Sequence, residues 1–381
     1  MIIMIDASRA LHPQPTGIGW YCQEIIRALL DLEEARQHEW LLLAPDTPLE
    51  NHPLYRLPDY AKWQIVPGRR AWTWLHLSWF FARHPKFRQA VFFVPGHTLP
   101  FITPKKSVVV IHDFAFRYFP EAYGRLKAWW LNHELARSAA KAATIIVPSL
   151  ATARDLTTSY KTPAKQIKVI AHGVDHEHYQ PLTEAEKMGL PAPIRQAGSY
   201  FLTLGRVEKR KNSRRILDAY REFRETNTET HTKLIFIGKP GYGWPEINTT
   251  YQQLPTHIKK DVLILGYQPT DLALLWLKNA QALIYPSLYE GFGLPILEAQ
   301  AAGVPVLTST ASSLHEVADQ AAIFVDPSNT SELTAGLNKL STDRTLLIRL
   351  RQKGMANAQT FTWQKAAQQT LTTLLAVGEK K

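Results

Sequence analysis

The chain has 381 residues, a length that suits two α/β domains better than one. Its hydrophobic fraction of 45% is that of a globular protein, and no run of about 20 apolar residues is available to span a bilayer. The single cysteine, Cys22, excludes an intramolecular disulfide, and a net charge of +11 favours an anionic partner. No zinc-finger, RNP or helix-turn-helix motif is present, so a nucleotide diphosphate or an anionic membrane surface is favoured over nucleic acid.

The chain opens with an apolar segment, residues 2–6, which is predicted to be a buried strand. It lacks the basic region and the small-residue cleavage site of a signal peptide, so we expect a cytoplasmic protein. Thr16-Gly17-Ile18-Gly19 then opens an amphipathic helix predicted over 19–32. The motif is too short for the dinucleotide fingerprint, but Gly17 and Gly19 let the backbone approach a donor phosphate or an acceptor.

The rest of the first half alternates strand and helix patterns. Predicted strands, rich in β-branched or aromatic residues, lie at 38–44, 90–95, 107–113 and 143–148. A helix is predicted over 126–141. This rhythm indicates a mainly parallel sheet covered by helices on both faces.

Residues 69–83 mix cations with bulky aromatic side chains and allow two interpretations. The segment can form an interfacial helix that docks on anionic lipid, giving a cytoplasmic protein peripheral contact with the membrane. Its apolar residues are, however, spread widely around the helix, which favours burial against the sheet equally well. The sequence alone leaves this choice open.

His112 ends the predicted strand 107–113, at the edge where parallel sheets carry their functional residues. It is either a structural histidine or a group that hydrogen-bonds the donor or positions an acceptor. We expect Asp113 to orient its ring. Ser149, after the next strand, is expected to cap a helix over 150–158.

A second set of elements begins after residues 181–198, which contain three prolines and no strand pattern and are predicted to be a linker. Strands are predicted at 200–205, 233–238, 262–266, 282–287, 304–309 and 322–327. Helices are predicted at 212–226, 270–279, 295–302 and 331–340, and the segment 344–376 is predicted helical. We therefore expect an α/β fold with a first domain over 1–180, a second over 199–360, and a C-terminal helix in 361–381 that packs back on the first. In such folds, two parallel-sheet domains face each other across a ligand-binding cleft.

The segment 285–299 carries the clearest ligand-binding motif. A predicted strand is followed by a glycine-containing loop and by a helix whose first turn holds Pro295, where a missing N–H group is tolerated. Backbone N–H groups of such a loop and the positive end of the helix dipole form a phosphate cradle. The cradle consists of Gly291, Phe292, Gly293 and Leu294.

Two acidic residues flank this cradle. Glu290 precedes it, where its carboxylate could accept bonds from sugar hydroxyls, and Glu298 lies about one turn inside the helix, where it could accept ribose hydroxyls. Spacing alone also allows Glu290 to be a loop-surface acid and Glu298 a first-turn acid favoured by the helix dipole.

A basic loop at 204–212 forms the second candidate site. Gly205 ends a strand, and Arg206 and Lys211 follow it, so that two cations can neutralise the charge that develops on a diphosphate leaving group. No acidic cluster suited to Mg²⁺ is present, and neither a metal nor another cofactor is expected. The alternative is a solvated basic loop, and residues 208–210 (Glu208, Lys209 and Arg210) are interpreted as solvated.

In combination these motifs resemble the retaining GT-B glycosyltransferases of family 4. The resemblance is carried by Glu290-x7-Glu298, the 204–212 loop, the segment 301–309, His-Gly-Val-Asp at 172–175, and Val-Val-Ile-His-Asp at 109–113. It covers nearly the whole chain, and the opening is similar to bacterial mannosyltransferases of polysaccharide or O-antigen assembly. The resemblance implies metal-independent retaining transfer of a hexose, with GDP-mannose as the first candidate donor, to a glycan or lipid-linked acceptor.

The resemblance also implies residue roles. Glu298 would bind ribose, Glu290 the transferred hexose, and Arg206 and Lys211 the diphosphate, with the cradle backbone assisting. His112 would lie beside the reacting sugar.

The glycine loop is a weaker part of this match. Gly17 and Gly19 would shape the donor–acceptor loop, but Trp20 stands where relatives often carry Arg. Acceptor details near this turn are therefore not transferred.

Other functions stay open on the sequence. A two-domain nucleotide-sugar epimerase would need no acceptor. A non-catalytic glycan-binding or scaffolding subunit would be expected to lack a site residue, whereas the four charged site residues are all present. A nucleic-acid binder has only the net charge in its favour.

Overall fold

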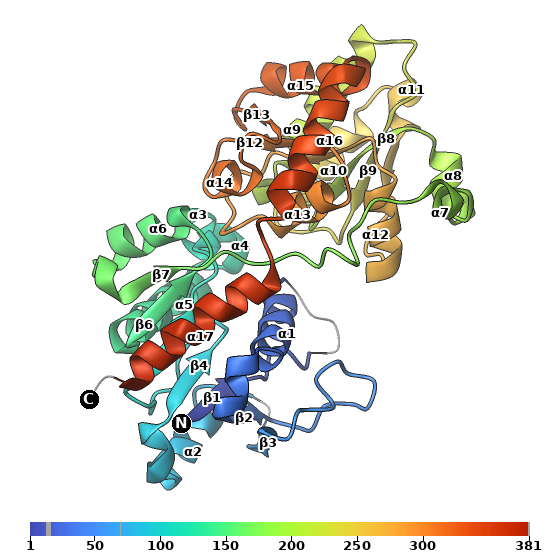
Figure 1. Cartoon of the computed structure of the whole chain (residues 1–381). Helices are drawn as coiled ribbons and strands as arrows, with labels where there is room; N and C mark the ends of the chain where they lie inside the picture. The colour runs from blue at the N-terminus through green and yellow to red at the C-terminus, as the bar shows by residue number, and fades with distance from the viewer. Residues whose placement is uncertain (13–16, 69, 380–381) are drawn as a thin grey trace. The chain divides into compact units, whose positions relative to one another are not determined.

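The computed structural model describes residues 1–12, 17–68 and 70–379, and the chain divides into two compact units. Unit 1 combines Met1–Gly173 with Thr362–Lys381, and unit 2 comprises Val174–Phe361. Each unit is built on its own sheet (Figure 1). Thr16 and Arg69, which belong to motifs named above, lie outside the described residues.

The described part of unit 1 contains a seven-stranded sheet of order β3-β2-β1-β4-β5-β6-β7, in which all neighbours pair in parallel. Its central strands are almost entirely buried and mostly apolar, as the sequence pattern predicts. The strands are β1 (Ile2–Asp6), β2 (Glu39–Ala44), β3 (Ala61–Ile65), β4 (Val91–Val94), β5 (Ser107–Val110), β6 (Thr144–Val147) and β7 (Ile167–Val169).

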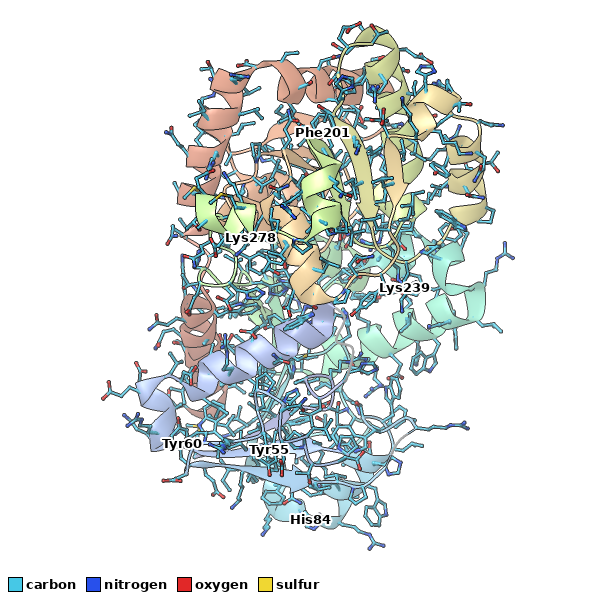
Figure 2. The ribbon with its side chains drawn as sticks, turned by 90° about the vertical axis from the view of Figure 1, so that its right-hand side faces the viewer. Tyr55, Tyr60, His84, Phe201, Lys239 and Lys278 are labelled. Carbon is cyan, nitrogen blue, oxygen red and sulfur yellow. The ribbon has the colours of Figure 1, made fainter. Side chains whose placement is uncertain are left out.

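The sequence pattern missed β3 and β7, which are the two edge strands of this sheet. An edge strand has a neighbour on one side and is partly solvated, so it needs no continuous apolar run. In β7 both Lys168 and Val169 are exposed. The start of β3 is held instead by Tyr60, whose hydroxyl donates to the carbonyl of Leu30 at the end of α1; Figure 2 labels this residue.

Helices cover this sheet. The α-helices of unit 1 are α1 (Gly17–Leu30), α2 (His76–Arg83), α3 (Ala115–Tyr118), α4 (Pro120–Tyr123), α5 (Arg125–Lys141), α6 (Leu150–Tyr160) and α17 (Trp363–Glu379). The Ser149 hydroxyl accepts a bond from the N–H of Thr152 at 3.0 Å, which confirms it as the cap of α6. Although α17 comes from the far end of the chain, it packs along α1 and contributes Ala367, Leu371 and Leu374 to the core of unit 1 (Figure 1).

Unit 2 repeats the architecture. Its described residues form a six-stranded parallel sheet of order β10-β9-β8-β11-β12-β13. Phe201 of β8, labelled in Figure 2, is fully buried in its core. The strands are β8 (Tyr200–Leu204), β9 (Lys233–Ile237), β10 (Val262–Ile264), β11 (Ala282–Tyr285), β12 (Val306–Ser309) and β13 (Ile323–Val325).

The α-helices of unit 2 surround this sheet. They are α7 (Glu184–Met188), α8 (Ala192–Ala197), α9 (Ser213–Thr226), α10 (Trp244–Gln252), α11 (Thr256–Lys259), α12 (Thr270–Lys278), α13 (Leu294–Ala301), α14 (Leu314–Ala318), α15 (Thr330–Thr342) and α16 (Arg344–Ala358). The segment 181–198 carries α7 and α8 and clusters with unit 2. The chain passes between the units at Gly173–Val174 and at Phe361–Thr362. The helical segment predicted over 344–376 is therefore two helices, one in each unit.

The aromatic segment beginning at Arg70 is divided between core and surface. Trp72, Phe80 and Phe81 are buried, whereas Leu75 and Trp79 are exposed. The Trp72 indole N–H donates to the carbonyl of Val66 at 2.7 Å. The burial interpretation thus holds for part of the segment only. None of the described helices combines the length and apolarity that crossing a bilayer requires.

Candidate functional site

The loops of the two predicted donor motifs follow neighbouring strands of unit 2. β8 leads into residues 205–212 and β11 into residues 286–293, and the two strands are adjacent in the sheet. From this pair the strand order runs outward in opposite directions, which makes it a topological switch point, where open α/β sheets bind ligands. The fold therefore brings Lys211 and Glu290, far apart in the chain, into contact.

Glu290 is buried and held between two cations. Lys211 Nζ lies 2.5 Å from Oε1 of Glu290, and Arg210 Nη1 lies 2.8 Å from Oε2. Burial alone would raise the pKa of Glu290, but Lys211 and Arg210 outweigh it and hold this pKa at about 2. Glu290 is therefore an ionised carboxylate bonded through both oxygens, and the interpretation of it as a loop-surface acid is wrong.

Lys211 lies across the end of β8. The Lys211 side chain covers Gly205, where an added Cβ would stand 3.3 Å from Lys211 Cε. Gly205 adopts φ +109°. The ammonium donates to the Tyr285 hydroxyl and lies 4.3 Å from the centre of that ring. Burial lowers the pKa of Lys211, and Glu290 opposes that shift. The cation predicted from the sequence is thus held in place by an acid and an aromatic ring.

Arg210 was interpreted as a solvated loop residue, and that interpretation is wrong. Besides Glu290, its guanidinium bonds the carbonyl of Tyr289 at 3.1 Å and Glu208 at 2.9 Å. Glu208 is itself buried, whereas Lys209 is exposed as expected. Arg206 is also exposed, and among the described residues no acid pairs with its guanidinium.

The cradle loop is fixed by Ser313. Its hydroxyl oxygen lies 2.9 Å from the carbonyl oxygen of Glu290 and 2.8 Å from that of Phe292. Gly293, at φ +111°, is the N-cap of α13, and as a glycine it has no side chain to cap this helix. These two carbonyl oxygens are thus directed toward the Ser313 hydroxyl. The positive end of the α13 dipole lies beside this loop and is suited to binding an anion.

Glu298 lies on α13 beyond this end. Burial raises the pKa of Glu298 to about 7, although a hydrogen bond from the Tyr179 hydroxyl and the charge of Lys211 oppose the shift. It is therefore not a solvated first-turn acid. Tyr179 gave no motif in the sequence, because its partner lies more than a hundred residues away. Its position shortly after the His-Gly-Val-Asp motif is the one signal that could have pointed to it.

A surface beside this site was also missed. Lys239 (labelled in Figure 2) and Tyr267 follow β9 and β10, and the Lys239 ammonium lies 5.1 Å from the centre of the Tyr267 ring. Tyr267 is exposed. Each directly follows a glycine at the end of a strand, Gly238 and Gly266, and this is the signal in the sequence that could have pointed to them.

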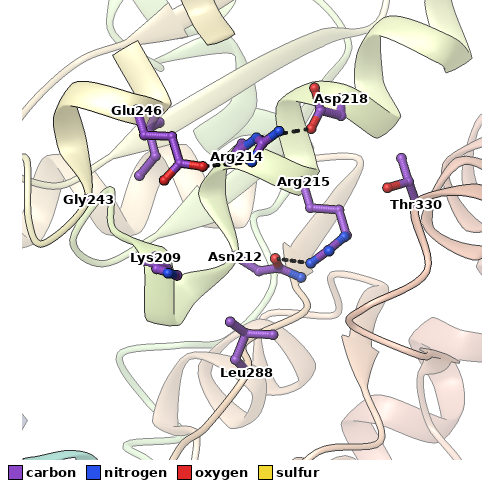
Figure 3. Close-up of a pocket in the computed structure, with 10 residues that line it drawn as sticks. Lys209, Asn212, Arg214, Arg215, Asp218, Gly243, Glu246, Leu288 and Thr330 are labelled. Atoms are coloured by element: carbon purple, nitrogen blue, oxygen red, sulfur yellow. Dashed lines mark hydrogen bonds and ion pairs between the residues drawn. The ribbon is translucent and has the colours of Figure 1, made fainter. Parts of the chain in front are cut away.

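Residues of the loop 209–212 also line a cavity of about 270 Å³ (Figure 3). Asn212 donates from Nδ2 to the carbonyls of Pro327 at 2.7 Å and Pro286 at 3.2 Å, which ties this loop to the one after β11. Around the cavity, Arg214 bonds Glu246 at 2.6 Å and Arg215 bonds the carbonyl of Pro327 at 3.0 Å. The cavity is lined by Lys209, Asn212, Arg214, Arg215, Asp218, Gly243, Glu246, Ile247, Leu288 and Thr330.

In unit 1, His112 follows β5 and is buried among rings. Its Nε2 lies 2.8 Å from the carbonyl oxygen of Pro95, and its ring lies 4.7 Å from that of Tyr21 and 5.2 Å from that of His97. Because a carbonyl only accepts, Nε2 carries the proton and Nδ1 is an acceptor. Burial, with the charge of His97, lowers the pKa of His112 to about 3, so the ring is neutral near pH 7.

The expected role of Asp113 is wrong. Its carboxylate accepts the N–H of Ala115 at 2.9 Å, and the Pro95 carbonyl orients the His112 ring instead. Gly17 and Gly19 begin α1; Gly19 is buried, and a Cβ on Gly17 would meet no described atom within 4 Å. Packing within the described part of unit 1 therefore does not require a glycine at position 17. The described residues include no group of three His, Cys, Asp or Glu side chains that could hold a metal ion.

Comparison with known proteins adds family information to this geometry. Residues 191–359 match the model "Glycosyl transferases group 1", and residues 15–178 match "Glycosyltransferase Family 4". O-antigen chain mannosyltransferase B of Escherichia coli is 26% identical over 383 residues, covering 97% of this chain and 98% of that protein. O-antigen chain mannosyltransferase RfbU of Salmonella typhimurium is 24% identical, over 61% of this chain and 59% of that protein.

Solved structures share the fold. HepE of Anabaena, in complex with UDP-glucose, has a TM-score of 0.72 at 17% identity and covers 98% of this chain and 99% of its own. WaaG, a glycosyltransferase involved in lipopolysaccharide biosynthesis, has a TM-score of 0.68 at 16% identity, with 97% and 98% covered. At these identities the likeness establishes the two-domain GT-B fold.

The Glu290 network predicts an unequal cost for removing two acids. Glu290→Ala leaves Lys211 without its counter-charge and leaves Arg210 with Glu208 alone, and should lower the free energy of unfolding by about 3 kcal/mol. Glu184→Ala removes a 2.6 Å ion pair with Lys187 at the surface and should cost about 0–1 kcal/mol. Denaturant unfolding at pH 7 measures both.

The pH dependence gives a second readout of the same network. Since the folded pKa of Glu290 lies near 2 and below its ordinary value of 4.5, this stabilisation is present above pH 4.5 and is lost as the pH falls toward 2. Equal costs for the two variants would contradict the buried network.

Proposed function

The chain belongs to the family 4, group 1 glycosyltransferases, and we propose that it transfers a hexose from a nucleotide diphospho-sugar with retention of anomeric configuration and without a bound metal. We propose mannose, from GDP-mannose, as the sugar and a glycan or lipid-linked glycan as the acceptor. The names of the two O-antigen mannosyltransferases support mannose and this acceptor class. The observation that carries the proposal is the contact of Lys211 and Arg210 with Glu290 beside the uncapped end of α13.

The charges of these loops suit departure of a diphosphate. When the bond between the sugar and the diphosphate breaks, negative charge develops on the leaving phosphate oxygen. Arg206 is exposed for direct contact, and Lys211 is held beside the cradle by Glu290 and Tyr285. These two cations and the helix dipole can stabilise this charge, which is the part that a metal ion takes in other enzymes.

Glu290 is poorly suited to attack the sugar as a nucleophile. Both of its carboxylate oxygens are bonded to cations, and a pKa of about 2 marks a weak base. We therefore propose that the acceptor hydroxyl attacks an oxocarbenium-like sugar on the face from which the diphosphate departs. In this mechanism Glu290 orients the cations and accepts hydroxyls of the transferred hexose.

His112 fits the role of a hydroxyl acceptor. Its proton on Nε2 is committed to Pro95, so Nδ1 presents a lone pair, and the low pKa prevents protonation near pH 7. A neutral imidazole of this tautomer accepts a bond from a sugar hydroxyl and does not attract a phosphate. We propose that His112 accepts a bond from such a hydroxyl of a substrate.

Calorimetric binding of a nucleotide panel tests the donor. GDP, UDP, ADP, GDP-mannose, UDP-glucose and UDP-N-acetylglucosamine are titrated in the presence of EDTA, with Glu298→Ala as the control. We expect GDP and GDP-mannose to bind without metal, and affinity to fall at least tenfold in the variant, on the order of 1.4 kcal/mol. Binding restricted to another base would overturn the GDP assignment, and loss of binding in EDTA would overturn the metal-free mechanism.

Two neighbouring lysines separate a catalytic role from general basicity. Lys211→Ala should lower turnover at least tenfold, because it removes a cation placed at the leaving group. Lys209 is exposed and lies two residues before Lys211. Lys209→Ala removes an equal charge and should change turnover less than twofold. Initial rates with a saturating donor measure this difference, and equal effects would contradict the assignment of Lys211.

Donor affinity should depend on pH through Glu298. Its pKa near 7 means that the carboxylate is charged above this pH and protonated below it. Only the charged form accepts bonds from two ribose hydroxyls, so the donor KM should rise as the pH falls from 8 to 6, by at most about tenfold per unit. The diphosphate of a nucleotide sugar does not titrate in this range. Glu298→Gln should flatten the profile; an unchanged slope in that variant would refute the ribose-binding role.

A further inference from the structure

Unit 1 exposes large apolar side chains on two of its helices. On α5, Leu126 is 86% and Trp129 68% exposed, and Trp130 is 36% exposed. On and just before α2, Leu75 and Trp79 are each 57% exposed and stand one turn apart. We call these five residues the apolar patch. The core of unit 1 does not need these side chains, since other residues of both helices are already buried in it.

Trp74 links the two helices. Its ring centre lies 4.6 Å from that of Trp130, and its indole N–H donates to Glu134 of α5 at 2.8 Å. Glu134 is buried and also pairs with Arg137 at 2.7 Å. The exposed residues of α2 and of the first half of α5 therefore belong to neighbouring surfaces held together by a buried contact.

The chain's positive charge is concentrated in this part of the sequence. Residues 60–141 contain 13 Lys and Arg against three acids, a net charge of +10, whereas the whole chain carries +11. One of the three acids is Glu134, which is buried and paired with Arg137. Arg125 and Lys127 are exposed on either side of Leu126. Arg83 lies over the ring of Trp79, 4.0 Å from its centre, so exposed cations accompany the apolar patch on both helices.

We propose that the apolar patch docks unit 1 on an anionic lipid bilayer. Leucine and tryptophan side chains enter the boundary between headgroups and acyl chains, and lysine and arginine side chains contact the anionic headgroups. Indole rings suit this boundary because one edge is apolar and the other is a hydrogen-bond donor. Apolar area and positive charge act together there, and both are present here.

Charge argues against the other occupants of such a surface. A second copy of the chain would bring the same positive surface against this one, and like charges repel. A neutral protein partner would cover the apolar patch but would leave the surrounding cations without counter-charges. A bilayer with anionic lipid satisfies both features, and this docking requires neither the donor nor the acceptor of the proposed reaction.

Vesicle sedimentation of the full chain, without nucleotide sugar, tests the proposal. One vesicle type is phosphatidylcholine alone, and the other has roughly one third phosphatidylglycerol. We expect at least tenfold tighter binding to the anionic vesicles, weakened by salt. Leu126→Ser with Trp129→Ser should reduce that binding at least tenfold, and Arg125→Glu with Lys127→Glu should reduce it in the same way.

The matched control uses exposed apolar residues of unit 2. Met188 is 74% and Ile348 59% exposed, and both lie outside the basic region. Met188→Ser with Ile348→Ser should leave vesicle binding unchanged. All substituted side chains are exposed, so circular dichroism should show an unaltered fold.

Three outcomes would overturn the proposal. These are equal binding to both vesicle types, an equal loss in the control variant, and a dimer in light scattering that the Leu126/Trp129 variant abolishes. The last result would assign the apolar patch to self-association. Because no donor is present, none of these results bears on the proposed transfer reaction, and failure of the nucleotide panel leaves vesicle binding unaffected.

Discussion

At the carboxyl edge of the unit 2 sheet, a buried carboxylate is bonded to two half-buried cations, and the surrounding loops depend on this contact. An isolated charge is costly to remove from water, so Glu290 requires the partners it has in Lys211 and Arg210. To reach it, the Lys211 side chain lies across Gly205. Asn212 and Ser313 then tie the surrounding backbone. The loops after β8 and β11 are consequently one structural unit, although almost 80 residues separate Lys211 and Glu290.

This constraint also divides the work among the charged residues. Glu290 and Lys211 neutralise each other in the absence of donor, which keeps an ordered cation beside the cradle without an uncompensated charge. Arg206 is exposed and remains available for an entering anion. Burial raises the pKa of both acids, but Glu298 lacks a directly bonded cation among the described residues, so its pKa stays raised, whereas Lys211 and Arg210 outweigh burial at Glu290. Two acids of the same motif thus acquire opposite shifts from their surroundings.

The sequence predicted those parts of the fold and site that leave a local pattern. Buried strands such as β5 are continuous apolar runs, and the loop before α13 combines glycines with a proline. The edge strands β3 and β7 left no such pattern, because solvated edges need none. Arg210 was misjudged for a related reason: a basic residue in a basic loop is solvated unless a distant acid lies opposite, and Glu290 is 80 positions away. The break between α16 and α17 escaped notice because both helices have helical composition and only tertiary packing separates them.

The same reasoning distinguishes two kinds of basic site in this chain. Outside residues 60–141 the sequence is nearly neutral, with 31 Lys and Arg against 30 Asp and Glu. The cations of the loops after β8 and β11 belong to this balanced part, and burial explains the balance, since Lys211 and Arg210 could not be desolvated without Glu290 and Glu208. The cations of residues 60–141 are largely exposed and need no counter-charge from the protein, so the charge that balances them can come from outside. Net charge therefore supports the proposed contact of unit 1 with an extended anionic partner, whereas the acids that accompany the cations of unit 2 distinguish the proposed donor site.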